Sequence, residues 1–544
     1  MNFWTRHRQE FSLVALGAAH ALSFAPGPLP AWGLPLVQLI AFAAFTYYLF
    51  QSTRLAQAAQ RAFLFGWANF AVGLYWLYTS MHLYGGMHSA LAVAAVLLLA
   101  AGMALYGTIA AALVWWFLRR TRPNPARTGS MLLATALFAS VWALTEWLRG
   151  TLFTGFPWLA IGYAHADGIF SGWAAVVGVY GMSWLSAFTA AAIALVAQTR
   201  PQGNDQKAVV VLGLALVAGL AGMLIKYIPW AHPHGDPLIV RLAQGNIPQS
   251  QKFDPGHIQQ GIDTYLTMAG LPPKAADGAP KIIVLPETVV PLFQNRVDPS
   301  LWQRWIDVAR ERNAGVILGV PLADTQGDLT RYTNSAIGIT ANTPLNAIIA
   351  GRPDLRYDKH HLVPFGEFVP TGFRWFVDTM TIPLGDFARG PLPAPLFSLA
   401  GQRIAPNICY EDVFGEEIIQ FVRDRAPNEP GATLLVNMSN LAWFGDSWAL
   451  RQHLQISRVR ALETARPMLR ATNSGSTAAI DPNGNVRAQL PAGVPGVLDV
   501  EVQGMTGLTP YVQWGNTPVL FLSVMVLGLA AGRRKDSEPS ATTH

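Results

Sequence analysis

Three residues of the sequence have the types and the settings that nucleophilic catalysis requires. Cys409 is the only cysteine of the chain, and it ends the apolar run RIAPNIC directly before the polar residues Tyr410 and Glu411. Glu287 ends a second apolar run, KIIVLPE, and Lys359 lies in the largely apolar and aromatic loop YDKHHLVPFGEFVP. A thiol needs a base that removes its proton and a cation that favours the thiolate and the later oxyanion. Cys409, Glu287 and Lys359 are therefore candidates for nucleophile, base and cation.

Each of these residues also has an ordinary structural explanation. A lone cysteine can be a small buried hydrophobic residue, and Glu287 and Lys359 can each belong to a surface ion pair. The adjacent His360 and His361 allow a Cys and His pair or a metal site. No third ligand follows them at a spacing typical of zinc, so we predict no bound metal. The chemistry of the three residues requires no cofactor.

The elements that must position these residues alternate along the chain. From Ile239 to about Val502, short β-branched runs are separated by Gly and Pro turns and by helical stretches. We predict strands at 239–245, 281–287, 315–321, 334–340, 403–409 and 433–439, helices at 299–313, 415–424 and 448–465, and a hairpin turn at 481–485. This alternation is typical of a layered α/β domain, in which sites form at the carboxyl ends of the strands.

The remainder of the chain has the composition of a membrane region. Of its 544 residues, 51% are hydrophobic and 13% are charged, against roughly 25% charged in an ordinary globular domain. The first 229 residues hold only 16 charged residues. A helical span needs about 20 mainly apolar residues, and we predict eight spans, at 11–26, 30–50, 62–82, 88–118, 130–149, 169–198, 208–229 and 513–532. Length and charge exclude a cytosolic enzyme, a disordered chain and a disulfide-stapled secreted domain.

The basic residues predict the sidedness of these spans. Lys and Arg precede span one and lie between spans two and three, four and five, and six and seven, whereas the alternate loops hold almost none. Positive residues mark the cytoplasmic face, so we expect both termini in the cytoplasm and the α/β domain outside, in the periplasm of a bacterium. The net charge of +6 follows from this sorting and does not indicate nucleic acid. The predicted parts are a seven-span region at 1–229, a catalytic domain at 237–505, an eighth span at 511–534 and a polar cytoplasmic tail at 535–544.

Glu146 and Arg149 are exceptional because they lie three residues apart near the outer end of span five. A lone charge is costly at that depth, so the two residues either form a structural ion pair or contact a lipid head group or substrate. The sequence leaves both interpretations open.

Taken together, the segments around Glu287, Lys359 and Cys409 resemble the nitrilase superfamily, whose Glu, Lys and Cys come from three strand ends of an αββα sandwich. More closely, the chain resembles the apolipoprotein N-acyltransferase family of bacterial inner-membrane enzymes. The resemblance covers nearly the whole chain and includes the strings QGNIPQS, LPE, KHHLVPFGEFVP, ICYE, AWFG, RALETARPMLRATNSG and TGLTPY. It implies that Glu287 is the general base, Lys359 the oxyanion stabiliser and Cys409 the nucleophile.

The resemblance also implies roles for other residues. Glu367 and Glu411 match acidic positions that support the triad, and Trp443 and Phe444 match aromatic residues of a loop near the substrate entrance. The backbone amide of Tyr410 is expected to help hold the oxyanion. The chain departs from the family pattern at two positions, with Phe253 in place of Trp and Leu441 where Asp is frequent. These departures affect substrate contacts and leave the triad in place.

The function that the resemblance implies is acyl transfer from a phospholipid, usually phosphatidylethanolamine, to the N-terminal amine of a diacylated apolipoprotein through a thioester. The enzymatic alternative is a membrane-tethered amidase that uses water as acceptor, but one span would suffice to tether it. A transporter with an outer receptor domain is a further alternative. Transporters usually place ionisable groups within their spans, and residues 62–118 contain none of Asp, Glu, Lys or Arg.

Overall fold

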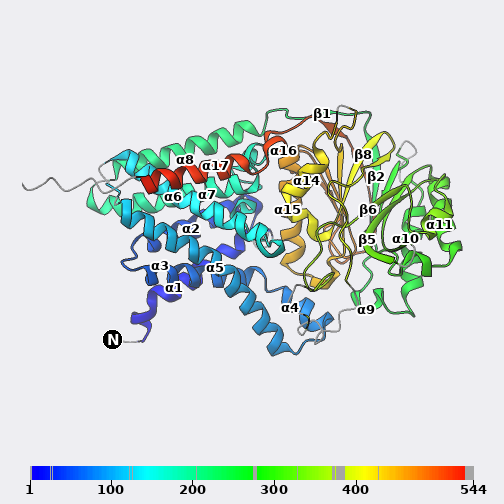
Figure 1. Cartoon of the computed structure of the whole chain (residues 1–544), viewed down its shortest axis with the longest axis horizontal. Helices are drawn as coiled ribbons and strands as arrows, with labels where there is room; N and C mark the ends of the chain where they lie inside the picture. The colour runs from blue at the N-terminus through cyan, green and yellow to red at the C-terminus, as the bar shows by residue number, and fades with distance from the viewer. Residues whose placement is uncertain are drawn as a thin grey trace, which may run out of the picture. The chain divides into compact units, whose positions relative to one another are not determined.

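The chain is divided into two compact units in a computed structural model (Figure 1). The structure describes residues 3–532 except 25, 27–28, 122, 125–126, 204, 274–277, 327–328, 370–373, 375–385 and 427. Unit 1 consists of the described residues of Met1–Tyr75, Ala94–Tyr227 and Trp514–His544, and unit 2 consists of those of Trp76–Val93 and Ile228–Gln513. The polar tail predicted at 535–544 lies outside the described residues.

Unit 1 is built of long helices (Figure 1). They are α1 (Phe3–Ala21), α2 (Leu34–Phe50), α3 (Leu55–Gly73), α5 (Ser89–Thr121), α6 (Thr128–Thr151), α7 (Ala174–Thr199), α8 (Gln206–Ile225) and α17 (Thr517–Gly532). Each of the eight apolar runs predicted from the sequence overlaps one of these helices. Helix α17 packs against α6 and α7, so the segment Thr517–Gly532 returns to helices of the first half of the chain.

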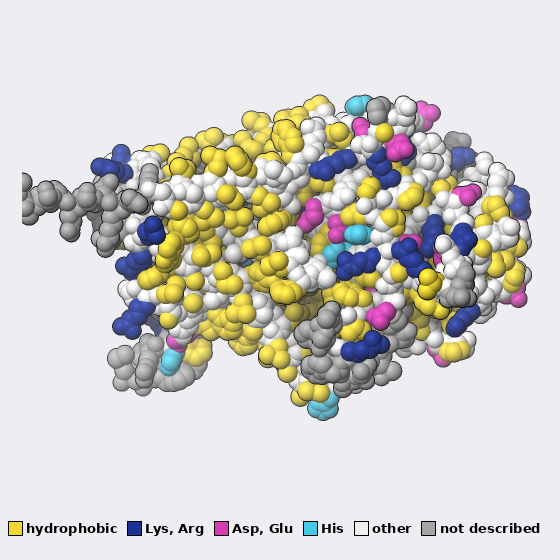
Figure 2. Space-filling view, viewed as in Figure 1, with side chains coloured by type: hydrophobic (Ala, Val, Ile, Leu, Met, Phe, Trp, Pro, Cys, Tyr) yellow, Lys and Arg dark blue, Asp and Glu magenta, His cyan; other side chains and the backbone are white. Residues whose placement is uncertain are grey.

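The outer surface of unit 1 has the character expected of a membrane protein. Large apolar side chains are exposed on α5, α8 and α17, including Leu98, Leu224 and Phe521, and Figure 2 shows hydrophobic side chains over most of the visible face of this unit. Exposed apolar surface on this scale needs an apolar environment. Within the described part of the chain, five helical segments are long and apolar enough to cross a membrane: Ala31–Phe50, Ser89–Thr121, Thr128–Thr154, Ser171–Thr199 and Gln206–Ile225. The count of eight spans stays a prediction.

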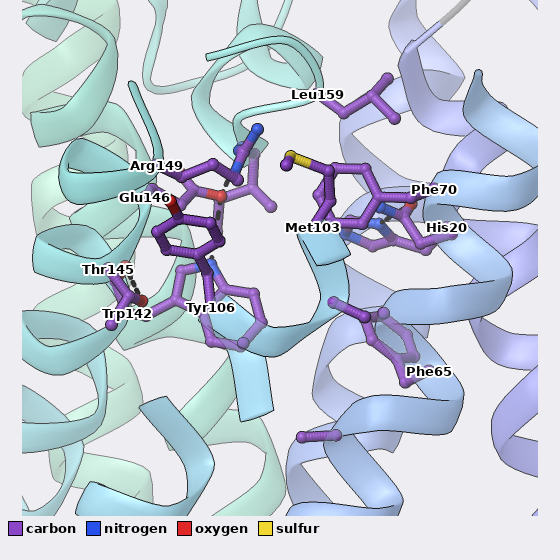
Figure 3. A pocket seen from close by; sticks show the side chains of 16 residues that line it. His20, Phe65, Phe70, Met103, Tyr106, Trp142, Thr145, Glu146, Arg149 and Leu159 are labelled. Carbon is purple, nitrogen blue, oxygen red and sulfur yellow. Dashed lines mark hydrogen bonds between the residues drawn. The ribbon is translucent and has the colours of Figure 1, made fainter. Parts of the chain in front are cut away.

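Glu146 and Arg149 of α6 line a small cavity inside unit 1 (Figure 3). Arg149 Nη1 donates to the carbonyl oxygens of Phe156 and Trp158, each at 2.6 Å. Glu146 Oε1 accepts from the amide of Ile161 at 3.0 Å and from the neighbouring indole of α6. The two charged side chains therefore hold the segment after α6 against the helix. Their hydrogen bonds satisfy backbone groups for which lipid offers no hydrogen-bond partner.

Unit 2 contains two six-stranded sheets. In the first sheet the order is β13 (Gly496–Val502), β2 (Leu238–Gln244), β3 (Ile282–Val284), β4 (Gly315–Gln326), β5 (Leu329–Ile339) and β6 (Leu355–Asp358); in the second it is β12 (Val486–Gln489), β11 (Ala478–Ile480), β10 (Met468–Thr472), β9 (Leu434–Ser439), β8 (Gln402–Ile408) and β7 (Phe397–Leu399). Parallel pairs lie at the centre of each sheet. In the first sheet β3 pairs in parallel with β2 and with β4, and in the second β9 pairs in parallel with β8 and with β10. A short pair, β1 (His232–Pro233) and β14 (Met505–Thr506), is separate.

The two sheets form the middle layers of an αββα sandwich. Ile282 and Val284 of β3 belong to a core that also contains Ile404 and Leu434 of the second sheet, whereas Ile283 belongs to a different core. This alternation follows from the period of two in a strand. Ile283 packs with α10 (Ile258–Gly270) and α11 (Pro299–Arg312), while α14 (Gly415–Val422) and α15 (Trp448–Thr464) contact the second sheet. The predicted layered α/β class and the nitrilase-like sandwich are confirmed.

Local sequence signals account for the ends of these elements. Asp298 caps α11 by accepting from the amide of Ser300, and Ser447 caps α15 through the amide of Ala449. Such caps satisfy amides that have no partner in the helix. At the predicted hairpin, Asp481 Oδ1 accepts from the amides of Asn483 and Asn485 between β11 and β12. Strand β3 is shorter than the predicted 281–287, since the pairing ends at Val284, two residues before Pro286.

The segment Trp76–Val93, which includes the first five residues of α5, belongs to unit 2, although the sequence places most of it within predicted spans three and four. Helix α3 ends at Gly73, and the short turns α4 (Leu77–Thr79) and η3 (Ser80–Tyr84) follow. The indole of Trp76 donates to Gln452 Oε1 of α15 at 3.0 Å. This segment therefore contributes to the surroundings of the site described below.

Candidate active site

The structure brings the three predicted catalytic residues together from three strand ends. Glu287 follows β3, Lys359 directly follows β6, and Cys409 directly follows β8. Lys359 Nζ lies 3.7 Å from Glu287 Oε1, and both residues are buried. The charges of Glu287 and Lys359 both act on the pKa of Cys409. Burial and the Glu287 carboxylate raise the pKa of the Cys409 thiol, whereas Lys359 opposes that rise. The resting thiol is therefore protonated and needs a base.

Two amide groups hold the carboxylate of Glu287. Asn334 Nδ2 donates to Oε1 at 2.8 Å, and the backbone amide of Asn440 donates to Oε2 at 3.0 Å. Asn334 Nδ2 also donates to Glu367 Oε1 at 2.6 Å. One asparagine of β5 thus sets the positions of both carboxylates, a contact that the sequence analysis did not identify.

Glu367 orients the ammonium group of Lys359. Lys359 Nζ lies 2.9 Å from each oxygen of Glu367, whose carboxylate also accepts from the amide of Val363. Burial alone lowers the pKa of Lys359, but Glu367 and Glu287 outweigh burial, and the pKa lies above its ordinary value. Lys359 therefore stays positively charged, as an oxyanion stabiliser must. Glu367 was predicted to support the triad, and it contacts Lys359 directly. Its effect on catalysis stays a prediction.

Glu411 joins the backbone at Lys359 to the backbone at Cys409. Its Oε1 accepts from the amides of His360 and His361 at 2.7 and 3.0 Å, and its Oε2 accepts from the amide of Ile408 at 2.6 Å. The hydroxyl of Tyr357 also donates to this carboxylate. Because the amides come from the ends of β6 and β8, Glu411 sets the distance between the two sheets at the site.

Cys409 has an unusual backbone conformation. Its φ angle is +54°, a region that residues other than glycine and asparagine rarely adopt. It begins the turn η9 (Cys409–Val413), and the amide of Tyr410 hydrogen-bonds to the Cys409 sulfur. The Tyr410 ring packs edge-on against His361 and Phe414. The structure therefore places the Tyr410 amide beside the sulfur, where an oxyanion donor is expected.

A cavity of about 230 Å³ opens beside Glu287. Its polar lining includes Glu287, Arg296, Asn334 and Asn440, and its apolar lining includes Phe253 and Trp443. The predicted loop residues lie in η10 (Leu441–Phe444), where Phe444 contacts the Trp76 ring at 4.6 Å and Trp443 contacts Tyr84 at 6.0 Å between ring centres. Of the two departures from the family pattern, Phe253 faces the cavity, whereas Leu441 is buried.

The two adjacent histidines have separate partners. His360 Nδ1 lies 2.8 Å from the carbonyl oxygen of Gly390, and His361 Nδ1 lies 2.8 Å from Glu417 Oε1. Among the residues that the structure describes, no group of three His, Cys, Asp or Glu side chains could hold a metal ion. The catalytic roles of Glu287, Lys359 and Cys409 stay predictions.

Lys252 is a second buried cation at the site, which the sequence analysis did not single out. It ends the short helix α9 (Gln249–Lys252), and its Nζ donates to the carbonyl oxygen of Glu287 at 2.9 Å. Gln249 of the same helix accepts from Asn440 Nδ2 at 2.9 Å. Helix α9 therefore supports both Glu287 and the residue whose amide holds its carboxylate.

We expect the effect of Lys252→Met on thiol reactivity to vanish at alkaline pH. Burial lowers the pKa of Lys252 to about 8, against the opposing charges of Glu287 and Cys409. Below pH 8 the ammonium favours the nearby thiolate, whereas above pH 8 the wild-type amine is neutral, as methionine is. Alkylation of Cys409 by iodoacetamide should therefore be about tenfold slower in the variant at pH 7 and should approach the wild-type rate near pH 9.5.

Lys252→Arg is the matched control for this experiment, because a guanidinium group stays charged over the whole range. Its alkylation rate relative to wild type should rise between pH 7 and pH 9.5. If the ratio of the alkylation rates of Lys252→Met and wild type does not change with pH, the charge of Lys252 has no effect on the reactivity of the Cys409 thiol.

Comparison with known proteins decides the family. Residues 16–192 match the family model described as apolipoprotein N-acyltransferase N-terminal domain, and residues 196–511 match the model described as carbon-nitrogen hydrolase. A relative from Bordetella bronchiseptica, named apolipoprotein N-acyltransferase, is 50% identical over 98% of this chain and 98% of its own. The chain belongs to the apolipoprotein N-acyltransferase family.

Other members of the apolipoprotein N-acyltransferase family are similar over equally long stretches. A relative from Ralstonia nicotianae is 44% identical over 96% of this chain and 92% of its own, and one from Pseudomonas putida is 37% identical over 98% and 99%. A solved structure of a nitrilase-superfamily amidase from Nesterenkonia AN1 is 18% identical, covers 53% of this chain and 97% of its own, and has a TM-score of 0.36. The resemblance inferred from the motifs is confirmed.

Proposed function

We propose that this protein transfers a fatty acyl chain from a phospholipid to the N-terminal α-amine of a diacylglyceryl-cysteine on an apolipoprotein. The observation that carries the proposal is the convergence of Glu287, Lys359 and Cys409 beside a partly apolar cavity, in a member of the apolipoprotein N-acyltransferase family. The apolar helices of unit 1 support lipid substrates, since a site at a bilayer can receive acyl chains without moving them through water.

In the first half-reaction Cys409 becomes acylated. Glu287 takes the thiol proton as the sulfur attacks the ester carbonyl of the phospholipid. Lys359 and the amide of Tyr410 hold the resulting oxyanion. The tetrahedral intermediate then collapses, the ester C–O bond breaks, and Glu287 gives its proton to the departing lysophospholipid oxygen. The products of this half-reaction are a thioester on Cys409 and a lysophospholipid.

In the second half-reaction the apolipoprotein amine attacks the thioester. Its reference pKa of about 7.7 to 8.0 leaves a useful neutral fraction near pH 7. Glu287 accepts the amine proton and returns it to the Cys409 sulfur as the C–S bond breaks. The cycle yields an amide and the free enzyme, and it uses no metal and no cofactor.

We further propose phosphatidylethanolamine as the donor and a bacterial inner membrane as the location. The arrangement of Arg and Lys in the loops supports cytoplasmic termini and a periplasmic catalytic domain at 237–505 between regions 1–229 and 511–534. The clustering of Lys and Arg at one end of unit 1 in Figure 2 is in keeping with this sidedness.

Intact-mass spectrometry of the full chain in detergent tests the proposal. After incubation with phosphatidylethanolamine we expect a mass increase of one acyl group that maps to Cys409. Addition of a diacylated lipopeptide should remove that group and produce a triacylated peptide. Release of free fatty acid without transfer to the peptide would favour the amidase alternative, and the absence of any adduct on folded protein would contradict the proposed donor.

Glu287→Gln should slow acylation by about 10² to 10⁴-fold, the range expected for loss of a general base. The glutamine oxygen can still accept from the Asn440 amide, but its NH2 group cannot accept from Asn334 Nδ2, so one of the two hydrogen bonds is kept and the other is lost. Single-turnover acylation measured by mass gives the rate, and Asp263→Asn, on the exposed face of α10, is the control. A rate equal to that of wild type would mean that another group accepts the proton.

A further inference from the structure

The carbonyl oxygen of Cys409 accepts hydrogen bonds from two buried side chains behind the site. His453 Nε2 of α15 lies 3.2 Å from this oxygen, and Asn437 Nδ2 of β9 also lies 3.2 Å from it. His453 is 1% exposed. Neither side chain has a role in the reaction described above. Both act on the peptide group that links Cys409 to Tyr410.

The neighbours of His453 determine where its proton lies. Arg470 Nη2 is 3.0 Å from His453 Nδ1, and because a guanidinium group can only donate, Nδ1 is the acceptor. The ring hydrogen is therefore on Nε2 and points to the Cys409 carbonyl oxygen. Three charged groups face the ring: Arg470, Asp412, whose Oδ2 is 3.7 Å from Nε2, and the more distant Lys359. Burial and Arg470 hold the pKa of His453 well below its ordinary value, so the ring is neutral.

This arrangement excludes His453 as the base that removes the proton of Cys409. One ring nitrogen is occupied by Arg470 and the other by the Cys409 carbonyl oxygen. Arg470 is itself fixed, since it is fully buried and pairs with Asp412 at 3.0 Å. His453 is therefore a rigid, neutral hydrogen-bond donor.

We propose that His453 is a positioning residue that orients the oxyanion-binding amide of Tyr410. A peptide group is planar, and its C=O and N–H point in opposite directions. Anchoring the Cys409 carbonyl oxygen from behind therefore fixes the Tyr410 N–H toward the sulfur, where the oxyanion forms. The anchor is needed because the φ angle of +54° at Cys409 is unfavourable for a side-chain-bearing residue. This inference rests on the proposed thioester mechanism.

Two reactions of Cys409 separate this role from a purely structural one. Alkylation by iodoacetamide forms a C–S bond and expels iodide, and it generates no oxyanion. Acylation by a p-nitrophenyl fatty ester forms a thioester, expels p-nitrophenolate and passes through an oxyanion. Both can be followed by intact mass on the full chain in detergent, and Cys409 is the only thiol. Neither reagent requires the natural phospholipid, so failure of the proposed donor is distinguishable from failure of this inference.

We expect His453→Met to lower the acylation rate about 10- to 100-fold, somewhat less than loss of a direct oxyanion donor, and to change alkylation less than threefold. His453→Gln, whose amide N–H can reach the position of Nε2, should recover most of the acylation rate. The maximal rate should fall while the ester concentration at half-maximal rate stays constant, and the pH profile should keep its shape. Equal losses in both reactions, no loss in either, or loss of the acid limb of the profile would overturn the proposal.

Discussion

Replacing Cys409 by alanine is expected to abolish acyl-enzyme formation, with a rate at least about 10⁴-fold below that of wild type. The reason is chemical, because no other thiol exists in the chain and a thioester can form only on this sulfur. The measurement is intact mass after incubation with phospholipid, followed by the lipopeptide transfer assay. A Cys409→Ala protein that retains full transferase activity would refute the mechanism.

Cys409→Ser is the matched control for this prediction. The hydroxyl keeps the size of the side chain and the hydrogen bonds of the surrounding backbone, including those from His453 and Asn437 to the carbonyl oxygen. An alkoxide is much harder to form than a thiolate, so acylation should still be very slow. Any adduct that does form should be an oxygen ester that hydroxylamine removes more slowly than a thioester. Such a result would show that the site binds its donor and lacks only the sulfur.

The sequence was sufficient to locate the site because its residues end strands. Glu287 and Cys409 each end an apolar run, and polar residues in that position are typical of sites in α/β folds. Lys359 follows the mixed sequence LRYD of β6, a strand that the sequence analysis did not predict. The order of strands and helices between 239 and 465 also follows from periodicity and turn residues, as the capped ends of α11 and α15 show. Local signals therefore predicted six of the twelve strands of the two sheets and the helices α11, α14 and α15, but not α10, β6, β7 or the strands after residue 465.

The residues that support the site could not be predicted in the same way. Asn334 lies in the middle of β5, Lys252 ends a four-residue helix, and His453 lies within α15. Each reaches the triad through a contact between residues far apart in sequence, which no local pattern specifies. One signal was available: Arg470 lies within the apolar run PMLRAT, and a buried arginine in a central strand requires a polar partner.

In unit 1, hydropathy alone limits how well membrane spans can be predicted from the sequence. Runs of apolar residues predicted the helices of unit 1, yet α1 and α3, each 19 residues long, are not apolar enough to be identified as spans. Their sequences carry charged and amide side chains that lower the mean hydropathy. Arg61 of α3, for example, is buried and donates to Gln9 of α1 at 3.0 Å. Contacts between helices thus satisfy polar groups that a hydropathy scale counts against a span.

Replacing Lys359 by methionine is expected to slow acylation by at least about 10³-fold, because two effects act together. The variant lacks a cation for the oxyanion, a loss that alone corresponds to about 10² to 10³-fold. It also leaves the carboxylates of Glu287 and Glu367 linked only through Asn334 Nδ2, with no positive charge between them. Two adjacent like charges disfavour full ionisation, so acylation in the variant should need a higher pH.

The variant Lys359→Arg separates the effect of the positive charge at residue 359 from the effect of the exact position of its N–H donors. The site holds a 1% exposed ammonium that contacts both oxygens of Glu367 at 2.9 Å, and a guanidinium group is larger and planar. The charge is retained, so the pH dependence should stay close to that of wild type, while the rate should still fall because the donor no longer points at the oxyanion. Single-turnover acylation between pH 6 and pH 9 measures both quantities. If Lys359→Met acylates at nearly the wild-type rate, the amide of Tyr410 alone must hold the oxyanion. In that case His453→Met should slow acylation more than Lys359→Met does.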